Sequence, residues 1–244
     1  MFNGLKYYKT LAFLAGVLFF LADAGKTFAQ DISISHDLVE RKVAMFGTDG
    51  KLFENPYINI AGTPFLFDTW KYGILEINEK DVFSNVQLRL DLLGQQVHLK
   101  KTDGNEVIIN PGAVKKITLF DSTGTVPALY FFECGFPSID NQNANNFYQI
   151  LCRGKIEFLK SQRKAVKEEK DSFSGEIKKE FASYEDYYFF DKNKLQRLKR
   201  DKTSILNMMK DKNDNIESFV QANKISFKSI DDIKKLVDYY NSLN

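Results

Sequence analysis

Cysteine and histidine are scarce in this sequence of 244 residues, which holds two of each. The cysteines are Cys134 and Cys152, the histidines are His36 and His98, and these four lack the close spacing that zinc ligands share. No G-x-S-x-G motif marks a nucleophilic serine, and no G-x-x-x-x-G-K-[ST] motif marks a phosphate-binding loop. The sequence therefore predicts no metal site, no cofactor and no catalytic residue of these kinds.

An excess of charge of one sign is also missing once the N-terminal segment is set aside. The whole chain has 34 Lys+Arg and 32 Asp+Glu, and residues 1–29 hold three of the lysines and one aspartate, so 31 of each sign remain. Residues 160–244 carry 19 basic and 15 acidic side chains, which are interspersed. Affinity for a nucleic-acid backbone requires clustered positive charge. We predict no nucleic-acid partner.

The N-terminal segment has the pattern of a secretory signal peptide. Lys6 and Lys9 precede an apolar run over Leu11–Leu21, and small residues follow as far as Ala29. A permanent anchor is the alternative, but the run is shorter than the roughly 20 apolar residues that a spanning helix needs. We predict cleavage after Ala29, a mature chain that starts at Gln30 and has no transmembrane span, and a periplasmic, outer-membrane-associated or extracellular location.

The stretch 62–120 predicts an antiparallel sheet. Apolar and polar residues alternate within 85–91, 96–101 and 115–120, and successive side chains of a strand point to opposite faces. Thr102-Asp103-Gly104-Asn105 separates two strands, and Asp-Gly tolerates the positive φ angles of a tight hairpin turn. Short local returns of this kind build antiparallel pairs.

The stretch 128–132 is different because it is apolar on both faces. Such a strand must be covered on both sides or must line an apolar hollow. A polar loop over 140–146 and a hairpin over 147–159 follow it. A disulfide between Cys134 and Cys152 would suit an oxidising compartment, and two free thiols are the alternative that stays open.

The C-terminal part contains a charged run and then helical spacing. Charges dominate 164–183, which predicts a linker or loop, and an aromatic hairpin follows over 184–198. Apolar residues recur at helical intervals after residue 202, with a capping box expected at Asp214 and Glu217. Ser229, with Asp232 three residues on, predicts the start of the last helix.

These patterns predict an α+β fold. We expect a curved, mainly antiparallel sheet of hairpins with a C-terminal group of short helices packed on it. The expected organisation is a signal peptide (1–29), an antiparallel β domain (30–163), a charged linker or loop (164–183), and a β-hairpin with C-terminal helices packed on the β domain (184–244).

Several short motifs spread over most of the mature chain carry a resemblance: Gly62-x-Pro64-Phe65, Val86-x-Leu88-x-x-Asp91, Gly135-Phe136-Pro137, Asn146-Phe147-Tyr148-Gln149 and Tyr239-Tyr240-Asn241-Ser242-Leu243. Together they resemble a group of secreted proteins of Bacteroidota-type Gram-negative bacteria that have no assigned activity. The resemblance implies an exported envelope protein. It implies no catalytic or binding residues.

A few residues could carry chemistry, and each has a plainer interpretation. His98 alternates with outward-facing residues, which predicts a surface imidazole, although a trio of Cys134, His98 and Asp91 could meet in space as a Cys/His enzyme. Asp121 and Glu133 lie near strand ends, where paired carboxylates could hydrolyse a glycoside. The loop 140–146 is rich in oxygen ligands but lacks the calcium-loop pattern.

Aromatic residues are the one compositional oddity, with 22 Phe and 11 Tyr. A core filled by rings is the plain interpretation, and an apolar ligand cavity or partner face is the alternative. The candidate residues for that face are Phe131, Phe132, Tyr148, Tyr187 and Tyr188. We therefore expect a non-enzymatic envelope protein that acts by binding or assembly; alternatives are a carrier of lipid or another apolar ligand in a half-barrel cavity, and a hydrolase. The partner is an unknown envelope protein or apolar ligand.

Overall fold

The computed structural model describes residues 56–77, 81–109, 112–170, 172–173 and 175–243. The chain divides into two units, 1–45 and 46–244, and all described residues belong to the second. The predicted signal peptide and His36 lie outside the described residues.

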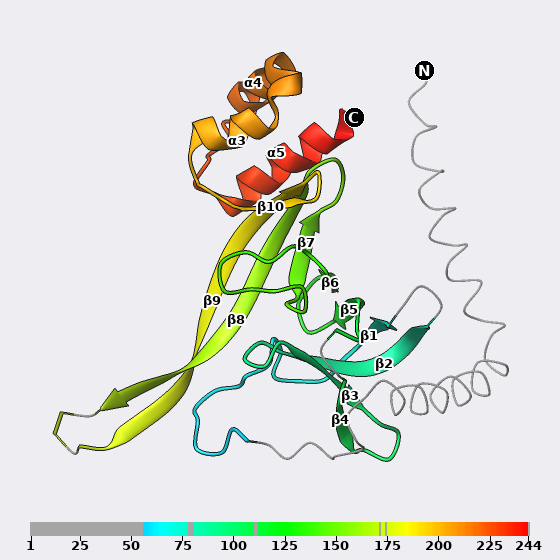
Figure 1. Ribbon diagram of the computed structural model, residues 1–244, viewed down its shortest axis with the longest axis vertical. Helices are drawn as coiled ribbons and strands as arrows, with labels where there is room; N and C mark the ends of the chain where they lie inside the picture. The colour runs from blue at the N-terminus through cyan, green and yellow to red at the C-terminus, as the bar shows by residue number, and fades with distance from the viewer. Residues whose placement is uncertain (1–55, 78–80, 110–111, 171, 174, 244) are drawn as a thin grey trace, which may run out of the picture. The chain divides into compact units, whose positions relative to one another are not determined.

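The described residues form one antiparallel sheet, as the sequence predicted. Ten strands are hydrogen-bonded in the order β10-β9-β8-β7-β6-β5-β1-β2-β3-β4 (Figure 1). Their bounds are β1 Lys71–Glu76, β2 Val82–Asp91, β3 Gln96–Lys100, β4 Glu106–Ile109, β5 Lys116–Asp121, β6 Ala128–Glu133, β7 Tyr148–Cys152, β8 Glu157–Lys170, β9 Ile177–Asp191 and β10 Lys194–Arg197. Most neighbours in the sheet are also neighbours in sequence, which is what short hairpin returns produce.

The predicted turn between β3 and β4 is confirmed. Gly104 has φ +87°, and its N–H donates to the carbonyl of Lys101 at 3.0 Å. Asp103 Oδ1 accepts from the N–H of Asn105 at 2.8 Å, so the aspartate closes the turn on its own backbone. The turn sets the register of Leu99 opposite Val107.

The sheet bends enough to bring its distant strands together. The N–H of Lys164 in β8 donates to the carbonyl of Leu92, just after β2, at 2.9 Å. Gln95 Nε2 donates to the carbonyl of Gln162 at 3.0 Å. Four strands lie between β2 and β8 in the sheet order. These contacts therefore confirm the expected curvature.

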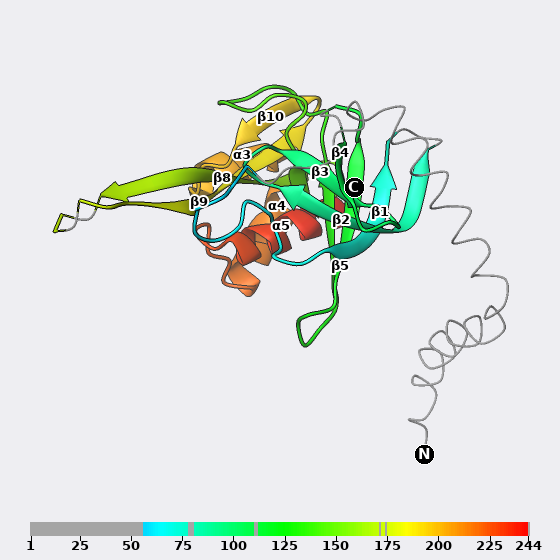
Figure 2. The same cartoon turned by 90° about the horizontal axis from the view of Figure 1, so that it is seen from below.

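The expected charged linker over 164–183 is wrong, because most of it is strand. β8 and β9 pair without interruption from Glu157 opposite Phe190 to Lys170 opposite Ile177. Figure 2 shows the two strands continuing away from their neighbours. Oppositely charged residues face each other across the pair, as in the ion pair between Glu168 and Lys179 at 2.6 Å. Charge composition alone suggested a solvated linker, but here the charges stabilise an exposed hairpin.

Helices α3 (Lys202–Met208), η1 (Lys210–Lys212), α4 (Asn213–Ala222) and α5 (Ile230–Ser242) close the chain. The predicted cap of the last helix is confirmed, because the Ser229 hydroxyl accepts from the N–H of Asp232. The capping box expected at Asp214 is wrong: α4 begins after Lys212, which makes no side-chain cap bond. No helix in the described ranges is both long enough and apolar enough to cross a membrane.

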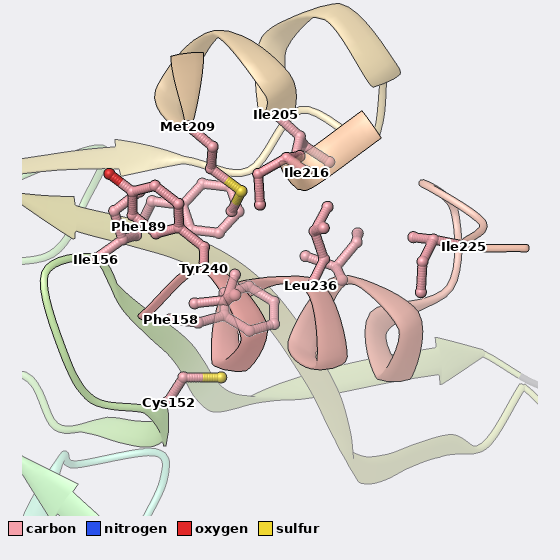
Figure 3. Packing of buried hydrophobic residues seen from close by; sticks show 12 residues of the cluster. Cys152, Ile156, Phe158, Phe189, Ile205, Met209, Ile216, Ile225, Leu236 and Tyr240 are labelled. Carbon is pink, nitrogen blue, oxygen red and sulfur yellow. The ribbon is translucent and has the colours of Figure 1, made fainter. Parts of the chain in front are cut away.

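One apolar cluster joins these helices to the sheet. Its fully buried centre lies on α5, where Ile233, Leu236 and Val237 have no exposed surface (Figure 3). Phe158 of β8 and Phe189 of β9 meet this stripe from the strands. Burying one such side chain stabilises the fold by roughly 1.5–3 kcal/mol before entropy is counted, so this cluster is the principal reason that short helices persist here.

A bulge in β7 decides where the second cysteine points. The pairing of β7 with β8 shifts between Ile150 and Cys152, so Cys152 turns to the helix side and its thiol donates to the carbonyl of Lys234 at 3.6 Å. Cys134 instead donates to the carbonyl of Val114 at 3.0 Å. Both thiols are free. The disulfide considered from the sequence is not formed, because the two side chains are directed at different parts of the chain.

Candidate functional site

Exposed apolar side chains gather on one side of β1, β5 and β6. Tyr72, Phe120 and Leu129 stand opposite one another in register, and in the next row Ile74 and Phe131 flank Thr118. Directly opposite residues of an antiparallel pair share a face. The exposed fractions are 51% for Tyr72, 37% for Ile74, 42% for Phe120, 55% for Leu129 and 45% for Phe131. We call these five residues the bare face.

The other side of the same three strands is core. Leu75, Ile117 and Phe132 alternate with the bare-face residues and are at most 1% exposed. The strands therefore carry apolar residues on both sides, although only one side is covered by residues that the structure describes. The double-sided apolar pattern of 128–132 predicted covering on both faces or an apolar hollow. The structure instead leaves Leu129 and Phe131 in contact with solvent.

Gly73 lets the bare face form as a close-packed surface. A Cβ at this position would lie 2.1 Å from the carbonyl oxygen of Thr118, well inside a van der Waals contact. Because Gly73 has no side chain, β1 can approach β5 closely, and in this register Tyr72 lies beside Phe120. The register between β1 and β2 also shifts directly after Gly73.

Charged residues at one end of the bare face are already paired within the chain. Glu133 accepts from Arg153 and lies 3.1 Å from Lys116. Burial would raise the pKa of Glu133, but the hydrogen bonds from Arg153 and Lys116 outweigh it and hold the pKa below its usual range. This border therefore offers little unpaired charge to a partner, and what the surface presents is chiefly apolar.

The residues proposed from the sequence as a ligand or partner face are not together. Phe131 lies on the bare face, whereas Phe132 is in the core below it. Tyr148 and Tyr188 are buried, with ring centroids 5.5 Å apart in an edge-to-face arrangement. Tyr187 points to the helix side and stacks on Phe158 at 5.9 Å. Four of the five thus fill the structure, and one remains exposed.

Sequence reasoning missed four members of the bare face: Tyr72, Ile74, Phe120 and Leu129. The signal was present in β5 and β6, where Phe120 and Leu129 take outward places in strands whose inward places are also apolar. In β1 the inward places include Lys71 and Gly73, so the pattern is weaker there. A sequence cannot reveal which of two apolar sides will be covered, so aromatic density drew attention to β7 and β9 instead.

His98 is buried with no exposed surface, so the predicted surface imidazole is wrong. Its Nδ1 lies 2.6 Å from Glu106 Oε1, and its Nε2 lies 3.9 Å from Asp91 Oδ2. The ring of Phe65 covers it edge-on at 5.1 Å. Residues before β1 therefore lie over this part of the sheet, and Tyr57 reinforces the cover by donating to Asp91 Oδ2 at 2.6 Å.

Arg89 completes this buried polar cluster. Its guanidinium lies 3.8 Å from the centroid of the Phe65 ring and 4.2 Å from that of Trp70. It also pairs with Glu106. Burial alone would raise the pKa of Glu106. The hydrogen bonds from His98 and Arg89 lower it by more than burial raises it, so the pKa of Glu106 lies below its usual value. The cluster fastens residues 57–70 to β2 and β3, which is a structural role.

The groups considered for catalysis are not activated. Burial raises the pKa of the Cys134 thiol, the opposite of what a thiolate nucleophile requires. The bond to Lys71 and those to Thr123 lower the pKa of Asp121 to about 2, so it stays a paired carboxylate in a turn. Glu133 is likewise held by its cations. The Cys134 thiol donates to the carbonyl of Val114, whereas the His98 ring lies against Glu106 and Asp91.

The polar loop 140–146 packs on the sheet beside a hollow of about 290 Å³. Tyr188 donates to Asp140 Oδ2 and accepts from Gln142 Nε2, both at 2.9 Å. Asp140 also lies 3.6 Å from Arg197, so its carboxylate is shared between two donors. Over the ranges that the structure describes, no three side chains of His, Cys, Asp or Glu converge as metal ligands would. The loop serves to cover Tyr148 and Tyr188.

Comparison with known proteins found no matching protein-family model, no matching curated protein and no matching solved structure.

Proposed function

We propose that this chain is an exported, non-enzymatic protein of the cell envelope that acts by binding another protein through the bare face. The observation that carries the proposal is the contiguity of Tyr72, Phe120 and Leu129 across three strands. Single exposed apolar residues are ordinary, but contiguous exposed apolar patches mark interaction surfaces. Aromatic residues are also enriched at protein interfaces.

The partner that fits is a protein with an apolar surface of its own. The charged border at Glu133 is satisfied by Arg153 and Lys116, so little charge is left there to complement. Packing against Phe120 and Phe131 would remove apolar area from water at roughly 25 cal/mol per Å². The affinity should then depend weakly on salt.

Site-specific crosslinking tests the proposal. A photoreactive benzophenone side chain at Phe131 should trap one protein from envelope extracts. The same side chain at Phe173, a fully exposed aromatic position between β8 and β9, is the matched control and should trap none. The double variant Phe120→Ser/Phe131→Ser should lose the partner while it keeps its fold. Equal trapping at both positions, or an unchanged partner in the double variant, would remove the bare face from the function.

The carrier alternative predicts a bound apolar molecule. Phe132, Tyr148 and Tyr188 are occupied in packing and hydrogen bonding, which leaves them poorly placed to line a cavity. Native mass spectrometry of the purified protein decides between the two. We expect the mass of the bare chain, and a reproducible added lipid mass would favour the carrier.

The hydrolase alternative depends on Cys134, Asp121 or Glu133. Cys134→Ser, Asp121→Asn and Glu133→Gln should leave any function in the envelope unchanged, provided that each variant folds. Loss of a measured turnover in one folded variant would revive this alternative.

Export rests on the N-terminal pattern and is tested separately. The protein recovered from its source should begin at Gln30 and appear in the envelope or medium. An intact N-terminus in the inner membrane would contradict cleavage, without bearing on the bare face.

A further inference from the structure

The C-terminal part of the described structure contains a hollow of about 680 Å³ that lies among β9, β10, α3, η1 and α5. Its lining contains five cationic side chains. Two carboxylates, Asp191 and Asp211, belong to the same lining. The cationic residues around it are Lys155, Lys192, Arg197, Lys199 and Lys210.

Part of this charge is neutralised within the chain. Lys155 pairs with Asp211, and the buried Tyr240 hydroxyl donates to Asp211 Oδ1 at 2.9 Å. Arg197 pairs with Asp186, which lies outside the lining. Asp211 is thus occupied by two donors, and Arg197 is held by a neighbour of the hollow.

Three lysines are left against one carboxylate. Lys192, Lys199 and Lys210 form no ion pair among the described residues, although the charge of Lys199 helps to lower the pKa of Asp201, which lies outside the lining. Asp191 is the remaining acidic group of the lining. The formal balance is therefore +2. Like charges that share a concave site repel one another, and an incoming anion relieves that repulsion while it gains the attraction of all three.

The floor of the hollow is apolar and firmly held. Phe189 and Ile205 are 2% and 1% exposed. Asn241 on α5 donates to the carbonyl of Ile156 at 2.8 Å and accepts from its N–H at 3.0 Å, which locks the turn that carries Lys155. A Cβ on Gly154 would lie 2.4 Å from the Asn241 side chain, so this turn and α5 are in tight contact. The site is formed before any ligand arrives.

We propose that this hollow binds a small organic anion that carries at least two negative charges, such as a phosphomonoester or a polycarboxylate. The volume lies within the roughly 300–1,000 Å³ of small-molecule pockets and exceeds the needs of a bare phosphate ion. The lysines bind the charged groups, and Met208, a partly exposed apolar residue of the lining, contacts the carbon skeleton. The proposal is independent of the bare face.

Titration calorimetry at low ionic strength tests it with three probes: glucose 6-phosphate, citrate and uncharged glucose. One or both anions should bind with one-to-one stoichiometry, and glucose should not. Which anion binds more tightly separates phosphate from carboxylate recognition. The double variant Lys199→Glu/Lys210→Glu should weaken binding by at least about tenfold, a change of about 1.4 kcal/mol. Lys224→Glu/Lys228→Glu, which removes the same charge outside the hollow, should not weaken it comparably.

Amide chemical shifts locate the site without a variant. Saturation with the bound anion should move the signals of Gln196 and Asn207, two residues of the lining. Failure of both anions to bind, binding that survives Lys199→Glu/Lys210→Glu, or shifts elsewhere on the chain would each overturn the proposal.

Discussion

Two parts of this sheet, β7–β9 and β1 with β5 and β6, both carry apolar residues on their two sides, but they differ in how those sides are covered. On β7, β8 and β9, the α3–α5 group covers one side and the loop 140–146 packs on the other. On β1, β5 and β6, one side is core and the other is the bare face. Phe158 is fully buried in the first part, and Phe131 is 45% exposed in the second. The difference lies in coverage, so the second part has the surface that a covering element needs and no described element over it.

The largest expected effect separates the two parts by one substitution made in each. Leu236→Ala on α5 should lower the free energy of unfolding by about 2–5 kcal/mol, because it opens a cavity in the core. Leu129→Ala on the bare face removes the same atoms from a half-exposed position and should cost well under that. Urea unfolding measures both, and equal losses would show that the bare face is covered in the isolated protein.

A second pair compares hydroxyl groups. Tyr188→Phe leaves Gln142 Nε2 without its acceptor and removes one of the two donors to Asp140, and should cost about 1–3 kcal/mol. Tyr72→Phe on the bare face should be near neutral, because its ring is half exposed. A neutral Tyr188→Phe would mean that water replaces the network beneath the loop 140–146.

Two glycine substitutions compare the close approach of β1 to β5 with a turn that requires only a positive φ angle. Gly73→Ala forces a methyl group against the Thr118 carbonyl and should destabilise by about 1–3 kcal/mol, as overpacking does. Gly104→Ala, at a turn glycine with open space around it, is the comparison for positive φ alone. If Gly73→Ala destabilises the protein less than Gly104→Ala does, β1 and β5 can move apart to accommodate the added methyl group.

A smaller effect concerns what ties β1 to β5. The hydrogen bond from Lys71, the largest contribution, and those from Thr123 together lower the pKa of Asp121 from 3.8 to about 2. A carboxyl whose folded pKa is depressed adds stability that is complete above the unfolded pKa and is lost as pH falls through the folded one. The wild type should therefore lose stability between about pH 4 and pH 2 more steeply than Asp121→Asn. Parallel pH profiles by thermal unfolding would contradict this role of Lys71.

Much of the fold was predictable because the relevant forces are local. The turn at Asp103-Gly104, the Ser229 cap and the strand alternation each depend on neighbours within a few residues. The strand pair over 164–183 was not predictable from composition, since the charges that suggest a linker are stabilising only when Glu168 meets Lys179 across the pair.

The candidate site was harder to predict for a related reason. Burial of His98 depends on Phe65, more than 30 residues earlier, and exposure of Phe131 depends on the absence of a described cover over β6. Neither follows from the spacing of side chains along one strand. Aromatic content correctly suggested that rings matter, but only the sheet register assembles Tyr72, Phe120 and Leu129 into one surface.

The most direct test of the bare face is the affinity for its crosslinked partner. We expect Phe120→Ser/Phe131→Ser to weaken binding by at least about a hundredfold, since truncating central aromatic anchors costs about 2 kcal/mol or more each. The exposed pair Val166→Ser/Ile177→Ser on the β8–β9 hairpin should bind as the wild type does. An unchanged affinity in the first variant, with its fold intact, would contradict the account.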